Sequence, residues 1–478
     1  MKRAFAAIVA LSLAAGARAE LPRPVAQAFV DAGVPLHSVS LVVQEIGAPK
    51  PLFVHDPTRP MNPASVMKLV TTFAALELLG RDYRWKTEAY LGGPLDQGIL
   101  RGDLILKGYG DPKITIEQWQ GFMAELRARG LDRVAGDLAL DRTWFKPLAH
   151  DPSEFDHEPL KPYNVGPDAL LVSFKSVRFV FAPNAAGDAV ELRAEPALAE
   201  VALGAPPAIA LGDCADWRGA LGATFVNHGG TARAAFAGHF AQTCGERDWY
   251  VALLDHPHFV HGMFTTYFRE AGGQFDGGLK ESRAPRGVAP FATLESPPLY
   301  DIVRDVNKLS NNVMARQIFL TLATTRHPPP ATPALAADVV QRFLKERRIA
   351  IPGLVLENGS GLSRNERVTA GGLAQLLAAA DRSAAREEFA SSLAVAATDG
   401  TVQKRFQNGT VAGQALLKTG TLEGVKALAG YVIDAQGERW IVVAIINHPH
   451  AARGQAALDG LVQWVYHSAA TWDPKAPR

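Results

Sequence analysis

Three short motifs, far apart in the sequence, contain the residue types that acyl transfer to a serine requires. A serine hydroxyl is a poor nucleophile at neutral pH unless an adjacent base takes its proton. A lysine amine can act as that base when burial or a neighbouring positive charge lowers its pKa. The motifs, in chain order, are Ser65-Val66-Met67-Lys68, Ser310-Asn311-Asn312 and Lys418-Thr419-Gly420.

If the three motifs meet in one cleft, each of their side chains has a chemical task. Ser65 is the expected nucleophile, and Lys68 lies three positions later, so the two side chains share one face of a helix. Lys418 is a second cation that lowers the pKa of Lys68 and attracts a carboxylate. Ser310 can pass a proton to a leaving amine. Asn312 can hydrogen-bond both the lysine base and a substrate amide.

The third motif adds two substrate contacts. Thr419 can hydrogen-bond a terminal carboxylate, and Gly420 lets a substrate backbone approach the strand edge closely. Each motif alone is a weak signal, because Ser-x-x-Lys is more often a solvated helix face and Lys-Thr-Gly is more often a turn. A competing Ser-x-Asn occurs at 363–365, but it follows a glycine-rich loop at 359–361. Ser310 lies in a helical pattern, which favours it for the second motif.

The helices and strands expected around these motifs come from both ends of the chain. Asn62 and Pro63 favour a helix start just before the first motif, and Gly80 favours its end. Apolar residues at helical spacing predict a helix over 299–323, which contains the second motif. Strands are predicted at 38–44, 51–54, 415–418, 428–433 and 440–446, and further helices at 333–348, 370–381 and 458–465.

The spacing of the motifs also predicts how the chain divides into domains. The interval from Lys68 to Ser310 is more than twice as long as that from Asn312 to Lys418. Because the motifs must meet, the longer interval must leave the catalytic domain and return, and its β-like runs predict two β-rich units. We expect residues 20–90 and 285–478 in the catalytic domain, 91–165 and 246–284 in an inserted domain II, and 166–245 in an inserted domain III.

The first nineteen residues have the pattern of a secretory signal peptide. Lys2 and Arg3 precede an apolar run at 4–17, and Ala17-Arg18-Ala19 is a small-x-small cleavage site. We therefore expect cleavage near Ala19 and a periplasmic or secreted protein, with no transmembrane anchor. Disulfides persist in such compartments, so Cys214 and Cys244 are expected to pair rather than to remain free thiols.

The composition excludes several other classes of protein. The chain has 478 residues, with 49 Lys and Arg against 48 Asp and Glu, which argues against a dedicated nucleic-acid-binding protein. We predict no cofactor and no metal, because no nucleotide-binding fingerprint occurs and the histidines lack a ligand spacing. Those histidines are His256, His258, His261, His448 and His450.

The three motifs together are the signature of serine β-lactamases and penicillin-binding proteins. Further stretches match one branch of this group over nearly the whole mature chain; they are 62–68, 108–112, 136–141, 162–164, 167–169, 358–364 and 399–401. The chain resembles the class C low-molecular-mass penicillin-binding proteins, which are DacB-like serine D-Ala-D-Ala carboxypeptidases/endopeptidases. This resemblance implies an α/β (α+β) fold: a β-lactamase/transpeptidase-like domain with an antiparallel five-stranded sheet flanked by helices, plus two inserted β-rich domains.

The resemblance also implies roles for individual residues. Ser65 would attack the penultimate D-Ala carbonyl of a peptidoglycan stem peptide, water would hydrolyse the acyl-enzyme, and β-lactam antibiotics would acylate the same serine. The N–H groups of Ser65 and Thr421 would form the oxyanion hole. The family has an acidic residue at the position of Asp141 and an arginine at that of Arg364, near the diaminopimelate side chain. Glu423 departs from relatives that have an amide there, which would change how the charged stem peptide is held.

Two other functional classes use the same scaffold. A serine β-lactamase needs fast deacylation, often by a Glu-held water, and no Glu-x-x-Leu-Asn motif occurs in this much longer chain. A non-catalytic cell-wall-binding protein would not need the intact motif residues. We therefore expect a serine D-Ala-D-Ala carboxypeptidase and DD-endopeptidase. Its oligomeric state stays open, a homodimer included.

Overall fold

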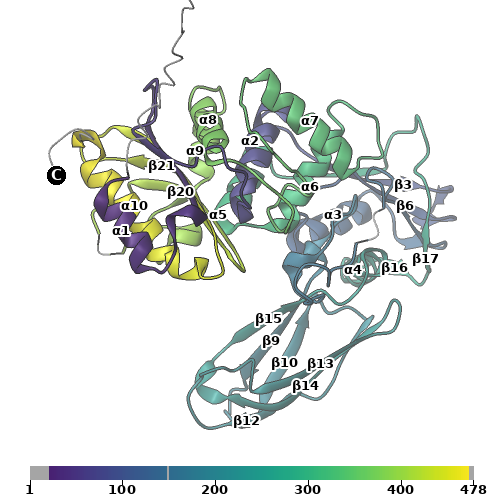
Figure 1. The fold of residues 1–478 in the computed structure, drawn as a ribbon. Helices are drawn as coiled ribbons and strands as arrows, with labels where there is room; N and C mark the ends of the chain where they lie inside the picture. Colours follow the sequence, from purple (N-terminus) through teal and green to yellow (C-terminus); the bar gives the residue numbers. More distant parts are fainter. Residues whose placement is uncertain (1–20, 148–149, 408, 473–478) are drawn as a thin grey trace, which may run out of the picture.

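The computed structural model describes residues 21–147, 150–407 and 409–472, so the predicted signal peptide lies outside the described residues. An antiparallel sheet with the strand order β19-β20-β21-β22-β1-β2 organises the part of the chain that contains the three motifs (Figure 1). Its strands are β1 (Val39–Glu45), β2 (Phe53–His55), β19 (Ala394–Val395), β20 (Ala415–Leu422), β21 (Val425–Ile433) and β22 (Arg439–Asn447). The sheet thus joins the two ends of the chain.

Helices cover both faces of this sheet, which explains why β22 is almost entirely apolar. Alternate residues of a strand point to opposite faces. Ile441, Val443 and Ile445 enter the hydrophobic core on one face, whereas Val442 and Ala444 enter the core on the other. The first core is covered by α8 (Ala370–Asp381) and the helices behind it, and the second by α1 (Arg23–Asp31) and α10 (Gln455–Ser468) (Figure 1).

The expected fold class is confirmed, with one more strand than the five expected. The additional strand is a short edge, because β19 contains only 2 residues and pairs with β20 through Ala394 and Val395. Behind the sheet lie five further helices that build the helical layer of the cleft. They are α2 (Lys68–Leu79), α5 (Leu299–Leu309), α6 (Asn312–Ala323), α7 (Pro333–Glu346) and α9 (Arg386–Ser392).

Two predicted helices differ in detail from the structure. The first begins as a 3-10 turn, Ala64–Met67, and becomes α-helical only at Lys68. The single helix predicted over 299–323 is two helices, because Ser310 adopts a left-handed conformation with φ of 58° and interrupts the helix. Asn311 then caps α6 by accepting a hydrogen bond from the N–H of Met314 at 3.0 Å.

The long interval between the first two motifs forms sheets that share no strand with the six-stranded sheet. One has the order β17-β8-β6-β3-β18, and a smaller one has the order β16-β7-β5-β4. They pack with α3 (Ile116–Ala128) and α4 (His256–Glu270). Their strands are β3 (Lys86–Leu91), β4 (Leu95–Asp96), β5 (Ile99–Leu100), β6 (Leu104–Gly108), β7 (Arg133–Val134), β8 (Leu138–Asp141), β16 (Gln274–Phe275), β17 (Leu279–Glu281) and β18 (Ala292–Glu295). Because β3 and β18 pair with each other, we propose that the insert begins near residue 86 and ends near residue 295.

The remaining strands form two sheets (Figure 1). Aromatic side chains pack between these sheets, Phe179, Phe181 and Phe236 among them. One sheet has the order β10-β9-β15, and in the other β14 pairs with β11, β12 and β13. The strands are β9 (Val177–Pro183), β10 (Val190–Glu195), β11 (Val201–Leu203), β12 (Ala208–Ala210), β13 (Leu221–Asn227), β14 (Ala232–Ala241) and β15 (Arg247–Val251).

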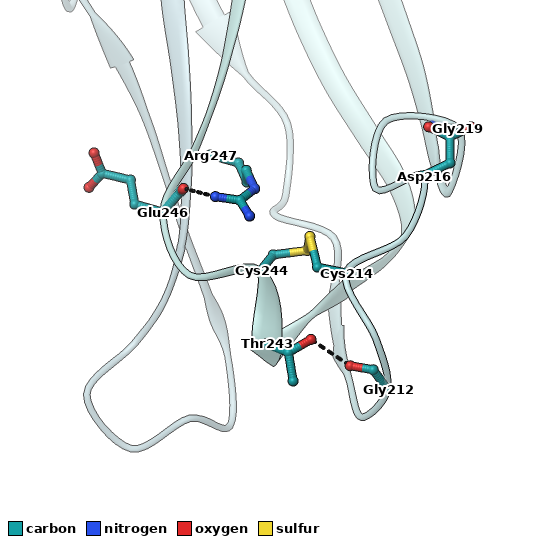
Figure 2. Close-up of a disulfide and its surroundings, with 8 residues drawn as sticks. All are labelled: Gly212, Cys214, Asp216, Gly219, Thr243, Cys244, Glu246 and Arg247. Atoms are coloured by element: carbon teal, nitrogen blue, oxygen red, sulfur yellow. Dashed lines mark hydrogen bonds between the residues drawn. A yellow bond between two sulfur atoms is a disulfide. The ribbon is translucent and has the colours of Figure 1, made fainter. Parts of the chain in front are cut away.

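The predicted disulfide is present. Cys214 and Cys244 are bonded, and the bond links the loop after β12 to the turn between β14 and β15 (Figure 2). A second contact holds the same loop, because the hydroxyl of Thr243 donates to the carbonyl oxygen of Gly212 at 2.6 Å.

Within the described ranges, no helix is both long and apolar enough to cross a membrane.

Candidate active site

Ser65 lies in the turn that precedes α2, and the asparagine before it fixes this turn to the sheet. Asn62 accepts a hydrogen bond from the N–H of Ala64 at 2.9 Å through its side-chain oxygen, and its own N–H donates to Asn447 of β22 at 2.8 Å. Its amide nitrogen donates to the carbonyl oxygen of Ser363 at 2.8 Å. The expected helix cap is therefore a junction of three segments, and it holds the serine in place.

Lys68 is fully buried beneath Ser65, and its amine has three acceptors. Its Nζ donates to Ser65 Oγ at 2.9 Å, to Asn312 Oδ1 at 2.6 Å and to the carbonyl oxygen of Ser360 at 2.5 Å. Three is the full donor capacity of an ammonium group. The structure thus brings together Ser65, Lys68 and Asn312, whose motifs are far apart in the sequence.

The pKa of Lys68 lies well below its usual range. Burial is the largest cause, and the positive charges of Lys418 and Arg316 act in the same direction. The carboxylate of Glu366 opposes them by favouring the charged amine. A lysine with a lowered pKa has a larger neutral fraction at neutral pH, which is the form that can accept a proton.

Lys418 and Ser310 form a second pair on the opposite side of the cleft. Lys418 Nζ donates to Ser310 Oγ at 2.9 Å and to the carbonyl oxygen of Thr419 at 2.9 Å. Lys418 is fully buried in β20, and burial lowers its pKa to about 7. The left-handed backbone of Ser310 places its hydroxyl here, at the end of α5.

A buried carboxylate that sequence reasoning missed holds the loop beneath Lys68. Glu366 accepts hydrogen bonds from four backbone N–H groups; they belong to Glu357 (3.1 Å), Asn358 (3.0 Å), Gly359 (2.8 Å) and Gly361 (2.9 Å). Burial raises the pKa of Glu366, and these four bonds offset part of that rise. The loop contributes the carbonyl oxygen of Ser360 that Lys68 contacts. The sequence feature that could have pointed to Glu366 is its position five residues after a glycine-rich loop, whose backbone N–H groups need acceptors.

Gly420 has a packing role besides the one expected from the sequence. A Cβ at this position would lie 2.6 Å from the carbonyl oxygen of Pro63 and 3.1 Å from the N of Ser65. The glycine therefore lets β20 pack directly against the turn that contains Ser65. Thr419 is half-buried beside it, and its hydroxyl donates to Thr401 at 2.7 Å.

A cavity of about 1050 Å³ opens from Ser65 toward the inserted sheets. Its lining includes Ser310, Asn312, Thr421, Arg364 and Glu423 from the predicted set. The guanidinium of Arg364 donates to the carbonyl oxygen of Glu423 at 3.1 Å and lies 3.5 Å from its carboxylate. The two residues are therefore partners on the rim of the cleft. Phe155, Tyr163, Phe174 and Tyr250 give the far wall an aromatic character.

Asp141 does not lie in the cleft, which corrects the expectation from the resemblance. Its side chain is buried at the end of β8 and is only 3% exposed. Its oxygens accept hydrogen bonds from the N–H of Thr143 at 3.0 Å, the hydroxyl of Thr143 at 2.6 Å and the N–H of Ala284 at 2.9 Å. This carboxylate is used to shape the turn after its own strand. The acidic residues of the inserted interval that line the cavity are Glu117, Asp156 and Glu195.

The histidines have local partners rather than a metal geometry. His258 contacts Asp255, the N-cap of α4, and His261 contacts Glu200 at 2.9 Å. His448 and His450 lie side by side after β22. Among the residues that the structure describes, no group of three or more His, Cys, Asp or Glu side chains is placed to hold a metal ion.

The chain is similar in sequence to known D-Ala-D-Ala carboxypeptidases. The model of the D-Ala-D-Ala carboxypeptidase 3 (S13) family matches residues 23–467. A D-alanyl-D-alanine carboxypeptidase of Actinomadura sp. (strain R39) is 29% identical over 95% of this chain and 86% of its own length. The D-alanyl-D-alanine carboxypeptidase DacB of Haemophilus influenzae is 25% identical over 81% of this chain and 80% of its own.

Structural similarity extends over the inserted sheets as well. The crystal structure of penicillin binding protein 4 from Haemophilus influenzae superposes with a TM-score of 0.75 at 22% identity, and it covers 92% of this chain and 98% of its own. This similarity confirms the fold. The match of the family model, which runs through all three motifs, shows that the chain belongs to the D-Ala-D-Ala carboxypeptidase 3 (S13) family and is a serine D-Ala-D-Ala carboxypeptidase.

Proposed function

We propose that this carboxypeptidase acts through an acyl-enzyme on Ser65, with Lys68 as the base. The observation that carries the proposal is the 2.9 Å contact between the two side chains, together with the lowered pKa of the Lys68 amine. A neutral amine at this distance accepts the serine proton while Oγ forms a bond to the carbonyl carbon of the penultimate D-Ala. The N–H groups of Ser65 and Thr421 stabilise the oxyanion that results.

The second pair completes the first half-reaction. When the tetrahedral intermediate collapses, the C–N bond breaks and the leaving amine requires a proton. Ser310 donates that proton and regains one from Lys418, to which it is hydrogen-bonded at 2.9 Å. Asn312 holds the Lys68 amine through its 2.6 Å contact. Lys68 then releases the proton it took from Ser65 and Lys418 regains one, so both amines return to their starting states. Water attacks the acyl-enzyme with the neutral Lys68 as base, the bond to Oγ breaks, and Ser65 recovers its proton from Lys68.

We further propose that the substrates include cross-linked stem peptides as well as peptides that end in D-Ala-D-Ala. The support is that the cleft is open on both sides of Ser65, because a cavity of about 1050 Å³ and a smaller pocket of about 280 Å³ leave room for a peptide on each side of the scissile bond. In an endopeptidase reaction, a second stem peptide replaces D-alanine as the leaving group. After removal of residues 1–19, the chain would act on peptidoglycan in the periplasm or outside the cell. Its oligomeric state is a separate question, for which a homodimer is the state to test.

β-Lactams are expected to acylate Ser65 and to be released slowly. One structure of penicillin binding protein 4 from Haemophilus influenzae is complexed with a β-lactam, and it superposes on this chain with a TM-score of 0.73. The experiment is labelling with a fluorescent penicillin, in which wild-type protein should be labelled and Ser65→Ala should not. Unlabelled wild-type protein would contradict the acyl-enzyme, and labelling that survives Ser65→Ala would identify another nucleophile.

Product analysis then separates the activities. Digestion of purified peptidoglycan should release D-alanine and should also convert cross-linked dimers to monomers. Release of D-alanine with intact cross-links would limit the enzyme to carboxypeptidase activity. Rapid hydrolysis of the penicillin would instead favour a β-lactamase, and binding of peptidoglycan without either product would favour a non-catalytic role.

A further inference from the structure

A second, smaller pocket opens from Ser65 on the side away from the inserted sheets. Its volume is about 280 Å³, roughly a quarter of the large cavity. Both cavities are lined by Ser65, Ser310 and Thr421. The cleft therefore divides at the nucleophile, so that a peptide whose scissile bond lies at Ser65 extends one part into each cavity.

Two cations line this smaller pocket, and they come from different elements. Lys426 lies on β21, directly opposite Thr421 of β20, and paired residues of neighbouring strands project from the same face. Arg405 lies shortly after the 3-10 turn Gly400–Val402. None of the described residues that line the pocket is acidic. The pocket thus has the charge that suits a carboxylate.

The two cations differ in how far their charges are already balanced. Arg405 donates to the carboxylate of Asp459 at 3.0 Å and pairs with it. Lys426 donates a hydrogen bond of 3.1 Å to the neutral side chain of Gln455. Within the described ranges no carboxylate forms an ion pair with Lys426, and its ammonium can make two further hydrogen bonds.

The surroundings of Lys426 make a bound anion favourable. The side chain is half-buried, and burial together with the positive charge of Arg405 lowers the pKa of its amine, although Asp459 offsets part of this effect. An ammonium group that is partly desolvated and lies beside another cation gains from a nearby negative charge. Hydroxyl groups of Thr419 and Thr421 line the same pocket and can donate further hydrogen bonds.

We propose that Lys426 is a charged contact for the α-carboxylate of the leaving group, on the side of Ser65 where Thr419 is already expected to hydrogen-bond it. The proposal rests on the acyl-enzyme at Ser65 and adds a binding residue that lies outside the three motifs. The C-terminal residue occupies the small cationic pocket, and the rest of the stem peptide occupies the large cavity. Arg405, which is paired with Asp459, adds to the positive potential of the small pocket. The carboxylate leaves with the amine after the C–N bond breaks.

The test compares two synthetic peptides that end in D-Ala-D-Ala, one with a free carboxylate and one with a C-terminal amide. In Lys426→Gln, kcat/KM for the free acid should fall about tenfold, which is the loss of one charge-assisted hydrogen bond, while kcat/KM for the amide stays within about twofold. Lys426→Arg, which keeps the charge, should retain most of the activity on the free acid. Release of D-alanine or D-alaninamide is measured by chromatography.

Lys404→Gln is the matched control, because Lys404 is an exposed lysine next to Arg405 that does not line the pocket. It should leave both peptides unaffected. If kcat/KM falls equally for the acid and the amide in Lys426→Gln, Lys426 has a structural role and the subsite is overturned. Unchanged kcat/KM for both peptides would also overturn the subsite. A wild-type enzyme that releases nothing from either peptide would overturn the acyl-enzyme proposal, and the subsite with it.

Discussion

The amine of Lys418 on β20 donates a hydrogen bond of 2.9 Å to the hydroxyl of Ser310, which lies in the break between α5 and α6. This contact joins the sheet to the helical layer across the cleft. Its partner contact, from Lys68 to Ser65, lies on the other side of the same cleft. Two buried amines therefore face two serine hydroxyls, and the positive charge of Lys418 lowers the pKa of Lys68.

Removal of the charge at position 418 should move the pH dependence of acylation. The positive charge of Lys418 lowers the pKa of Lys68, so in Lys418→Gln the Lys68 amine keeps its proton to a higher pH. We expect the acid limb of the acylation rate to shift upward, together with a lower maximal rate. The measurement is the second-order rate constant for acylation by a penicillin between about pH 5 and 9. An acid limb that stays in place or moves downward would contradict the coupling.

The wild-type pH profile contains a second contribution from Lys418 itself. Burial lowers the pKa of Lys418 to about 7, so its charge is present below this pH and fades above it. The same lowered pKa also makes the free energy of unfolding depend on pH. The folded protein binds fewer protons than the unfolded chain between about pH 7 and the usual lysine value near 10.4, so this group favours folding increasingly as the pH rises through that window.

Glu366→Gln should destabilise the loop beneath Lys68. The carboxylate accepts four backbone N–H groups, and a Gln amide would turn one of these contacts, to Gly361, into a meeting of two donors. We expect the free energy of unfolding to fall by about 1–3 kcal/mol, the cost of a buried polar group without a partner. Urea denaturation measures this fall. Acylation should also slow, because the carbonyl oxygen of Ser360 loses its support.

Glu357→Gln is the matched control for that change. Glu357 lies on the same loop, but its side chain is exposed and accepts hydrogen bonds from the side chains of Ser363 and Asn365 rather than from backbone N–H groups of the described loop. Its substitution should change stability by less than about 0.5 kcal/mol, as surface substitutions usually do. Equal effects of the two variants would show that the buried hydrogen bonds of Glu366 are not what holds the loop.

Gly420→Ala should impair acylation more than stability. The added Cβ would approach the N of Ser65 to 3.1 Å and the carbonyl oxygen of Pro63 to 2.6 Å, so the turn that contains the nucleophile must move away from β20. A displacement of this kind costs about 100-fold in rate, because attack requires a near-ideal geometry. The rate of penicillin acylation, read with the thermal midpoint, separates the two effects.

Gly460→Ala provides the comparison for a glycine without such a contact. Gly460 lies in α10, and a Cβ there would meet no atom within 4 Å. Acylation should be unchanged, and stability should rise by about 0.5–1 kcal/mol because alanine favours the helix. A large loss of acylation in this variant would mean that the assay reports general disturbance rather than the contact at Ser65.

Loss of the disulfide should destabilise the aromatic sheets without affecting the chemistry. Cys214 and Cys244 close a loop with a sequence separation of 30, which stabilises by about 3–4 kcal/mol in the chain-entropy model. In β15, Tyr250 lines the large cavity near one end, whereas Cys244 lies just before the other end. We expect Cys214→Ser/Cys244→Ser to unfold at lower urea concentration but to be acylated at the wild-type rate. A parallel fall in acylation would show that the two regions are coupled.

The sequence by itself determined the chemistry and most of the scaffold that carries it. Ser65, Lys68 and Lys418 were recognisable because their types and order reflect a reaction, and β22 was recognisable because a strand covered on both faces must be apolar throughout. The two cysteines could be paired because no other cysteine competes.

Only the tertiary structure decided the features that depend on contacts between distant segments. The need for glycine at Gly420 comes from the approach of β20 to Ser65, which no local pattern encodes. Glu366 became important because its loop buries it, and Asp141 proved to be a turn-forming residue because its strand ends beneath the surface. Folding places Lys426 of β21 opposite Thr421 of β20 and close enough to Arg405 for that positive charge to lower the pKa of Lys426. Residue type and order set the reaction, whereas burial and proximity, which exist only after folding, set the pKa values and the close approaches.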